Sequence, residues 1–188
     1  MPGSVIPVTG LILGPVGSIS QTDFPLVSPR LVNSTDTISP NFGDPCVLNA
    51  NNTYSNVAQF IANGGTLTGT TPLGVAKETT LVNPYYPNAG GQSMPAGTYA
   101  PGTELNLLTR GTINVAINNG TPTGAGQPVY VRVSANGALN IIGGFEAIAD
   151  GAHTVQIPNL VFKTGILSTD PATGQVTAQL TILNRLVP

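Results

Sequence analysis

The residues of this sequence that could carry chemistry are few, and their spacing matches no common catalytic or metal-binding motif. The chain has one histidine, His153, and one cysteine, Cys46. His153 could serve a Ser-His-Asp arrangement, but no Gly-x-Ser-x-Gly segment supplies the exposed nucleophile, so we expect His153 to be a turn or strand-start residue. Nothing near Cys46 in the sequence would activate its thiol, so we expect a buried structural residue. One histidine and one cysteine are also too few for a typical zinc site.

The acidic residues are dispersed along the chain and lack the spacing of a calcium-binding loop. They are Asp23, Asp36, Asp44, Glu78, Glu104, Glu146, Asp150 and Asp170. Two of them could still meet in space as a glycosidase pair, and the sequence does not select which. The glycines match neither a P-loop nor a dinucleotide-binding fingerprint. We therefore predict no catalytic residue, no metal and no cofactor, and keep a carbohydrate-active β-sandwich enzyme as an alternative.

Charge is scarce in this chain. Charged residues make up 7% of the sequence, against roughly 25% in an ordinary soluble domain, so little charge repulsion keeps copies apart. The basic residues are scattered, which argues against a nucleic-acid partner; they are Arg30, Lys77, Arg110, Arg132, Lys163 and Arg185. No apolar run approaches the ~20 residues of a membrane span, and the first residues lack the pattern of a signal peptide. This composition is typical of a protein packed against neighbours.

Glycine and proline are abundant, with 23 and 17 residues among 188. Both residues interrupt helices, so a mainly helical fold is excluded. The length suits one domain, or one domain with a long arm. We divide the chain into an extended Pro-rich arm at residues 1–45 and a β-rich body at residues 46–188.

The predicted arm places apolar residues between seven prolines. An ordered, apolar arm needs a surface to lie on, which is either another subunit or its own body. Its predicted anchors are Val5, Ile6, Leu11, Leu13, Leu26 and Val27. A Pro/Gly-rich loop at about 83–103 adds Tyr85 and Tyr86, which either anchor an interface or pack over the body.

The body carries one predicted helix and several predicted strands. Ser55 can cap a helix over residues 55–63, which Gly64 would end, and a strand is expected at 73–82. Apolar residues alternate with polar ones in 112–118, 129–134 and 175–182, so each of these strands should bury one face; in 129–134 the alternation places Arg132 outside.

Turn sequences predict hairpins between these strands. One at Asn136-Gly137 would join 129–134 to 138–142, and one at Asp150-Gly151 would join 145–149 to 152–157. Residues 170–174 would join 160–168 to 175–183. The predicted fold is mainly β, an antiparallel barrel-like or sandwich-like body with one short helix and the arm.

Several short segments also follow one another in a characteristic order. They are LTRGTINVA at 108–116, GQPVYVR at 126–132, GGFE at 143–146, DGAH at 150–153, IPNLVFK at 157–163 and the alternating segment 176–183, with SPR at 28–30, CVLNANNTY at 46–54 and LGVA at 73–76 in the first half. In this set and order, the chain resembles the structural cement proteins of tailed bacteriophages, also called head decoration proteins. The resemblance covers about two-thirds of the chain.

The resemblance implies a role rather than a reaction. Such proteins sit on the outer surface of the capsid and tie neighbouring major capsid protein subunits together against the pressure of packaged DNA. It implies a non-enzymatic virion protein, made in the cytoplasm of the bacterial host, whose partners are the major capsid protein and its own copies in a dimer or trimer. A tail or fibre-base module of the virion is an alternative, because such modules share the charge-poor composition.

Overall fold

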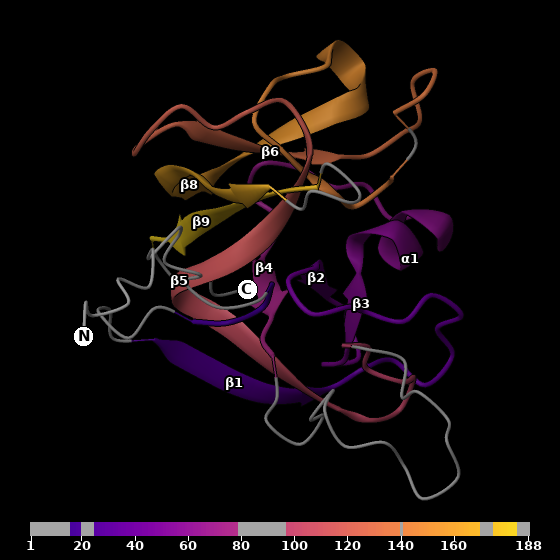
Figure 1. The fold of residues 1–188 in the computed structure, drawn as a ribbon. Helices are drawn as coiled ribbons and strands as arrows, with labels where there is room; N and C mark the ends of the chain where they lie inside the picture. The colour runs from indigo at the N-terminus through magenta and orange to yellow at the C-terminus, as the bar shows by residue number, and fades with distance from the viewer. Residues whose placement is uncertain (1–15, 20–24, 79–96, 140, 170–174, 184–188) are drawn as a thin grey trace, which may run out of the picture.

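The computed structural model describes residues 16–19, 25–78, 97–139, 141–169 and 175–183. Strands dominate this part of the chain, and α1 (Val57–Ala62) is its one α-helix (Figure 1). The strands are β1 (Leu26–Leu31), β2 (Pro45–Leu48), β3 (Tyr54–Asn56), β4 (Leu73–Ala76), β5 (Glu104–Asn119), β6 (Pro128–Arg132), β7 (Phe145–Glu146), β8 (Thr154–Thr169) and β9 (Val176–Ile182). The predicted mainly β fold is confirmed.

Strand β5 belongs to both halves of the sheet. Its second half pairs with β7 and β9, and the order β5-β7-β6-β8-β9 returns to β5, so these strands close into a barrel. Its first half pairs with β1 on one side and with β4 on the other, and β4 continues through β2 to β3. Figure 1 shows β5 running from the barrel strands down to β1. All described pairings between strands are antiparallel except that of β5 with β7.

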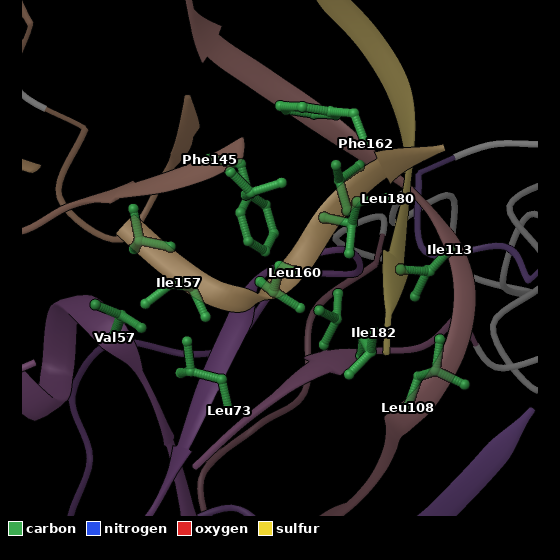
Figure 2. Close-up of a cluster of buried hydrophobic side chains, with 14 of the residues drawn as sticks. Val57, Leu73, Leu108, Ile113, Phe145, Ile157, Leu160, Phe162, Leu180 and Ile182 are labelled. Atoms are coloured by element: carbon green, nitrogen blue, oxygen red, sulfur yellow. The ribbon is translucent and has the colours of Figure 1, made fainter. Parts of the chain in front are cut away.

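The main hydrophobic core joins buried side chains of the barrel strands to side chains of β2, β4 and α1 (Figure 2). Side chains from β4, α1, β5, β7, β8 and β9 meet there, among them Leu73, Val57, Ile113, Phe145 and Leu180. As predicted, β9 turns Ala178, Leu180 and Ile182 inward, and all three are buried. The described part of the chain has no helix long and apolar enough to cross a membrane.

The helix starts later than predicted. Residues 54–56 pair with β2, so the chain cannot become helical before residue 57. The cap is therefore Asn56 rather than Ser55, and its Oδ1 accepts a hydrogen bond of 2.8 Å from the N–H of Gln59. The predicted strand 73–82 is formed over 73–76, and its residues 79–82 lie outside the described residues.

Two of the predicted hairpins are wrong, whereas the third is confirmed. Around Asn136-Gly137 the described residues form an isolated bridge between Asn136 and Leu139 instead of a strand over 138–142. Around Asp150-Gly151 the two flanking strands, β7 and β8, are separated by β6, which pairs with both. The short β7 enters the barrel between β5 and β6, and local turn signals do not encode such a long-range insertion. Strands β8 and β9 do pair antiparallel across residues 170–174, which lie outside the described residues.

Candidate interaction surface

His153 occupies the predicted turn position, in a short 3₁₀ turn at Gly151–His153 just before β8. Its Nδ1 lies 2.8 Å from the Oγ of Ser134. The nearby acid, Asp150, directs its carboxylate to Arg132 and Asn136. A serine and a histidine thus touch, but the acid that a triad would place on the imidazole is bonded to a guanidinium and an amide.

Cys46 is fully buried in β2, as predicted. Its Sγ lies 3.7 Å from the carbonyl oxygen of Asp44, to which the thiol donates. Burial, together with the negative charges of Asp44 and Asp36, raises the pKa of this thiol well above its usual value. Since the thiolate is the reactive form, Cys46 acts as a small core residue.

Three charged residues that are scattered in the sequence come together in the structure as a charge cluster, most of which is buried. Arg132, predicted to face outward, is 1% exposed, as is Glu146. Arg132 Nε lies 2.5 Å from Glu146 Oε1, and its Nη2 lies 3.1 Å from Glu146 Oε2 and 2.8 Å from Asp150 Oδ2. Asn119 and Asn136 donate the remaining bonds to the two carboxylates. The prediction that Arg132 lies outside is wrong because β7 and the turn at Asp150 cover that face of β6.

The described residues contain no group of three or more His, Cys, Asp or Glu side chains that could hold a metal ion. Asp36 lies apart from the charge cluster and is buried with both carboxylate oxygens lacking a hydrogen-bond partner. Burial raises the pKa of Asp36 above the ordinary value and outweighs the opposing effect of the nearby Ser55 and Asn33 side chains, neither of which comes within hydrogen-bond geometry of the carboxylate.

Strand β1 lies at an edge of the described sheet and is mostly exposed. Pro29 lies opposite Asn106, whose carbonyl accepts a hydrogen bond of 2.8 Å from Lys77 on the β4 side. Asn106 therefore turns its backbone groups away from β1, and its partner Pro29 turns away from β5 in the same way. The missing N–H of Pro29 falls on the outer edge, where an edge strand tolerates proline.

Alternation along the strand assigns the other residues of this edge. Val27 also directs its N–H and C=O groups outward, and no other described strand pairs with β1. Just past β1, Val32 forms a parallel bridge with Tyr54, so the open backbone of this edge ends before Leu31. Leu31 and Leu26 are 53% and 41% exposed. A shallow groove of about 410 Å³ adjoins this edge, lined by Pro29, Arg30, Leu31, Asn51, Asn52, Thr53 and Glu104. We call the outward groups of β1 and this groove the β1 edge.

The predicted anchors Leu26 and Val27 thus lie in β1, on the chain's own β5. Val27 packs against the main core, whereas Leu26 is exposed. Val5, Ile6, Leu11, Leu13, Tyr85 and Tyr86 lie outside the described residues. The structure adds Leu31 and Arg30 to this candidate surface. In the sequence, the one feature here that is typical of an edge strand is the proline between these residues and Val27.

A second hollow, of about 180 Å³, lies between the start of α1 and residues 141–144. Its lining includes Asp44, Asn41, Ala58 and two exposed isoleucines, Ile38 and Ile141. Asp44 Oδ2 accepts hydrogen bonds from the backbone N–H of Asn41 at 2.9 Å and from its Nδ2 at 3.1 Å. We call this hollow the Asp44 pocket.

Asp44→Asn is expected to stabilise the protein at neutral pH. Burial is the main cause that raises the pKa of Asp44 from 3.8 to about 6. A raised pKa in the folded state means that folding favours the protonated carboxyl, so stability is full below about pH 4 and falls as the pH rises through 6. Asparagine avoids that loss and can still accept from Asn41, so we expect a gain of about 2 kcal/mol at pH 7.5.

Urea unfolding at pH 7.5 and pH 4 measures this effect. The gain should disappear at pH 4, where both proteins are uncharged at this position. Glu104→Gln, at an exposed carboxylate, is the matched control. An Asp44→Asn protein that is less stable than the parent at both pH values would show that the bonds to Asn41 outweigh the burial of charge.

Comparison with known proteins identifies a family and a fold. The model of the family described as structural cement protein (E217 gp24/Pam3 gp6) matches residues 11–183. Among solved structures, a chain from the capsid of Myoviridae phage XM1 is similar with a TM-score of 0.55 and 14% identity, covering 92% of this chain and 91% of that chain. At that identity the likeness concerns the fold. No curated protein matches.

Proposed function

Since the chain belongs to the family of phage structural cement proteins, we propose that it is a non-enzymatic protein that binds the outer surface of a phage head and ties neighbouring major capsid protein subunits together. Membership of this family supports a structural role in the capsid. The finer proposal concerns where and how it binds. The β1 edge carries it, because the exposed side chains of Leu26 and Leu31 and the shallow groove beside them offer an apolar contact to the partner.

Binding of this kind stabilises by mass action. A cement protein that binds the assembled shell and not the separated subunits shifts the equilibrium toward the shell. We further propose that copies meet across a local two-fold or three-fold axis as a dimer or trimer. Val5, Ile6, Leu11 and Leu13 are proposed to reach a neighbouring subunit, and Tyr85 and Tyr86 to add to the same interface.

The alternative of a tail or fibre-base module makes a different prediction for the number of copies per particle. A cement protein repeats with the capsid lattice, whereas a tail component is present in few copies. Quantitative protein analysis of purified particles separates the two.

Leu31→Glu is expected to weaken head binding without unfolding the protein. The side chain is 53% exposed, so the fold tolerates a charge there, but a carboxylate in an apolar contact would lose its water. We expect the affinity for undecorated heads to fall at least about tenfold, which corresponds to ~1.4 kcal/mol. Sedimentation of heads mixed with purified protein measures it.

Ile166→Glu is the matched control, because Ile166 is 46% exposed in β8, which Figure 1 places on the opposite side from β1. It should decorate heads like the parent. If Leu31→Glu decorates equally well, or both variants fail equally, the β1 edge is not the surface that binds.

A further inference from the structure

We infer that the Asp44 pocket receives a lysine or arginine side chain of the coat protein. This inference rests on the proposed function, since it assigns one point of contact to that interface. The occupant is identified by the chemistry of the pocket, which combines an acceptor with apolar walls.

The acceptor is a carboxylate oxygen that the protein itself does not use. Both hydrogen bonds from Asn41 go to Oδ2 of Asp44, and Oδ1 receives none from the described residues. The carboxylate is half-buried, and none of the described basic residues lines the pocket. Burial and the bonds from Asn41 are the causes that shift the pKa of Asp44, and no basic group is among them. A cation is therefore the complement that this site lacks.

The apolar walls suit the alkyl part of a basic side chain. Ile38 and Ile141 are 40% and 57% exposed on the lining of the pocket, which also includes Ala58. Lysine and arginine bury their methylene stems on such surfaces while the charged head reaches a polar partner. A volume of about 180 Å³ holds several waters at ~30 Å³ each, which is room for one long side chain.

The walls are fixed before any partner arrives. The Oε1 of Gln59 accepts hydrogen bonds from the N–H groups of Thr37 and Ile38, at 2.9 and 2.8 Å, and so holds the Ile38 wall on α1. On the other wall, Gly143 has a φ of +83°, and a Cβ there would lie 3.1 Å from the backbone nitrogen of Ala58, so glycine lets this wall pack closely on the start of α1. A preformed pocket loses little conformational freedom on binding.

The coat protein is a better source of the cation than a second copy of this chain. Lys77 and Lys163 are half-buried and bonded to Glu78 and Thr112, and Arg132 is buried in the charge cluster. The exposed basic residues of the described chain are Arg30 and Arg110. Both belong to the β1–β5 pair, next to the β1 edge that the proposed function already assigns to the head.

Two variants test the pocket with matched controls. Asp44→Asn removes the charge and keeps the shape, and Glu78→Gln removes one charge outside the pocket. Ile141→Lys brings a competing ammonium to the mouth, and Ile148→Lys does the same at a residue that is similarly exposed, at 54%, outside the pocket lining. We expect Asp44→Asn and Ile141→Lys to bind undecorated heads about tenfold more weakly, and both controls to bind like the parent.

The outcomes separate this inference from the proposed function. If the parent protein does not bind heads, the proposed function fails and the inference falls with it. If the parent binds and Asp44→Asn or Ile141→Lys binds equally well, only the inference is overturned. A purely structural role would lower the melting temperature of Asp44→Asn along with its binding, and an occupant from a second copy would change the mass of the free oligomer. Either result would also overturn it.

Discussion

Leu180→Asp is expected to unfold most of the protein at room temperature. Leu180 is fully buried in the main core, where β9 faces Phe162 of β8 across the sheet. Truncating a buried leucine alone costs about 2–5 kcal/mol, and a carboxylate without a partner adds the penalty of burying a charge. Domains are stable by only about 5–15 kcal/mol, so little folded protein should remain.

Leu183→Asp makes the same chemical change immediately after β9, at a side chain that is 44% exposed. Its melting curve should stay within a few degrees of the parent. Circular dichroism melts of both variants give the comparison. Similar melting temperatures for the two would mean that the inward face of β9 is misassigned.

Glu146→Gln should cost about 3–5 kcal/mol, because it leaves the buried guanidinium of Arg132 without its main counter-charge. Arg132 bonds Glu146 through two nitrogens, and the second carboxylate, Asp150, is partly exposed. The bond from Arg132 is the main cause that holds the pKa of Asp150 below its ordinary value. The stability that this bond contributes is therefore present when the pH is above the ordinary pKa of Asp150, and it is lost as the pH falls through the lowered pKa of Asp150.

The double variant Arg132→Met with Glu146→Leu decides how the cost arises. Replacing a buried pair by apolar side chains of similar volume is often neutral or stabilising, so the double variant should recover most of the stability lost in Glu146→Gln. Urea unfolding of the three proteins at pH 7 measures the difference. A double variant as unstable as the single one would show that the cluster contributes through its specific bonds, including those from Asn119 and Asn136.

The parts of the fold that the sequence predicts are those encoded by local alternation. In β9 every second residue from Ala178 is apolar and buried, and in β5 the same holds for Ile113, Val115 and Ile117. The β8–β9 hairpin follows from two such strands in succession. The order of short motifs also led to the correct family, because order along the chain is a property that a single sequence displays.

The parts that failed depend on contacts between distant residues. Arg132 follows the alternation of an outward residue, yet β7 and Asp150 fold over it. The Asp44 pocket joins residues near 40, 57 and 142, and no local pattern relates these segments. The open edge of β1 is set by its register on β5, which tertiary structure alone determines.

The double membership of β5 also sets the order in which the chain can fold. Leu26 pairs with Arg110 and Ile113 pairs with Leu180. Strand β5 can therefore complete its pairing only when segments far before it and far after it in the sequence are both present. Topologies of this kind fold slowly, in milliseconds to seconds, because the entropy cost of closing long loops comes before the strands gain free energy by pairing. During synthesis, at about 5–20 residues per second, β5 emerges several seconds before β9 and its barrel side stays unpaired in the meantime. A nascent chain of this protein is therefore exposed to aggregation at β5 until residue 182 has left the ribosome.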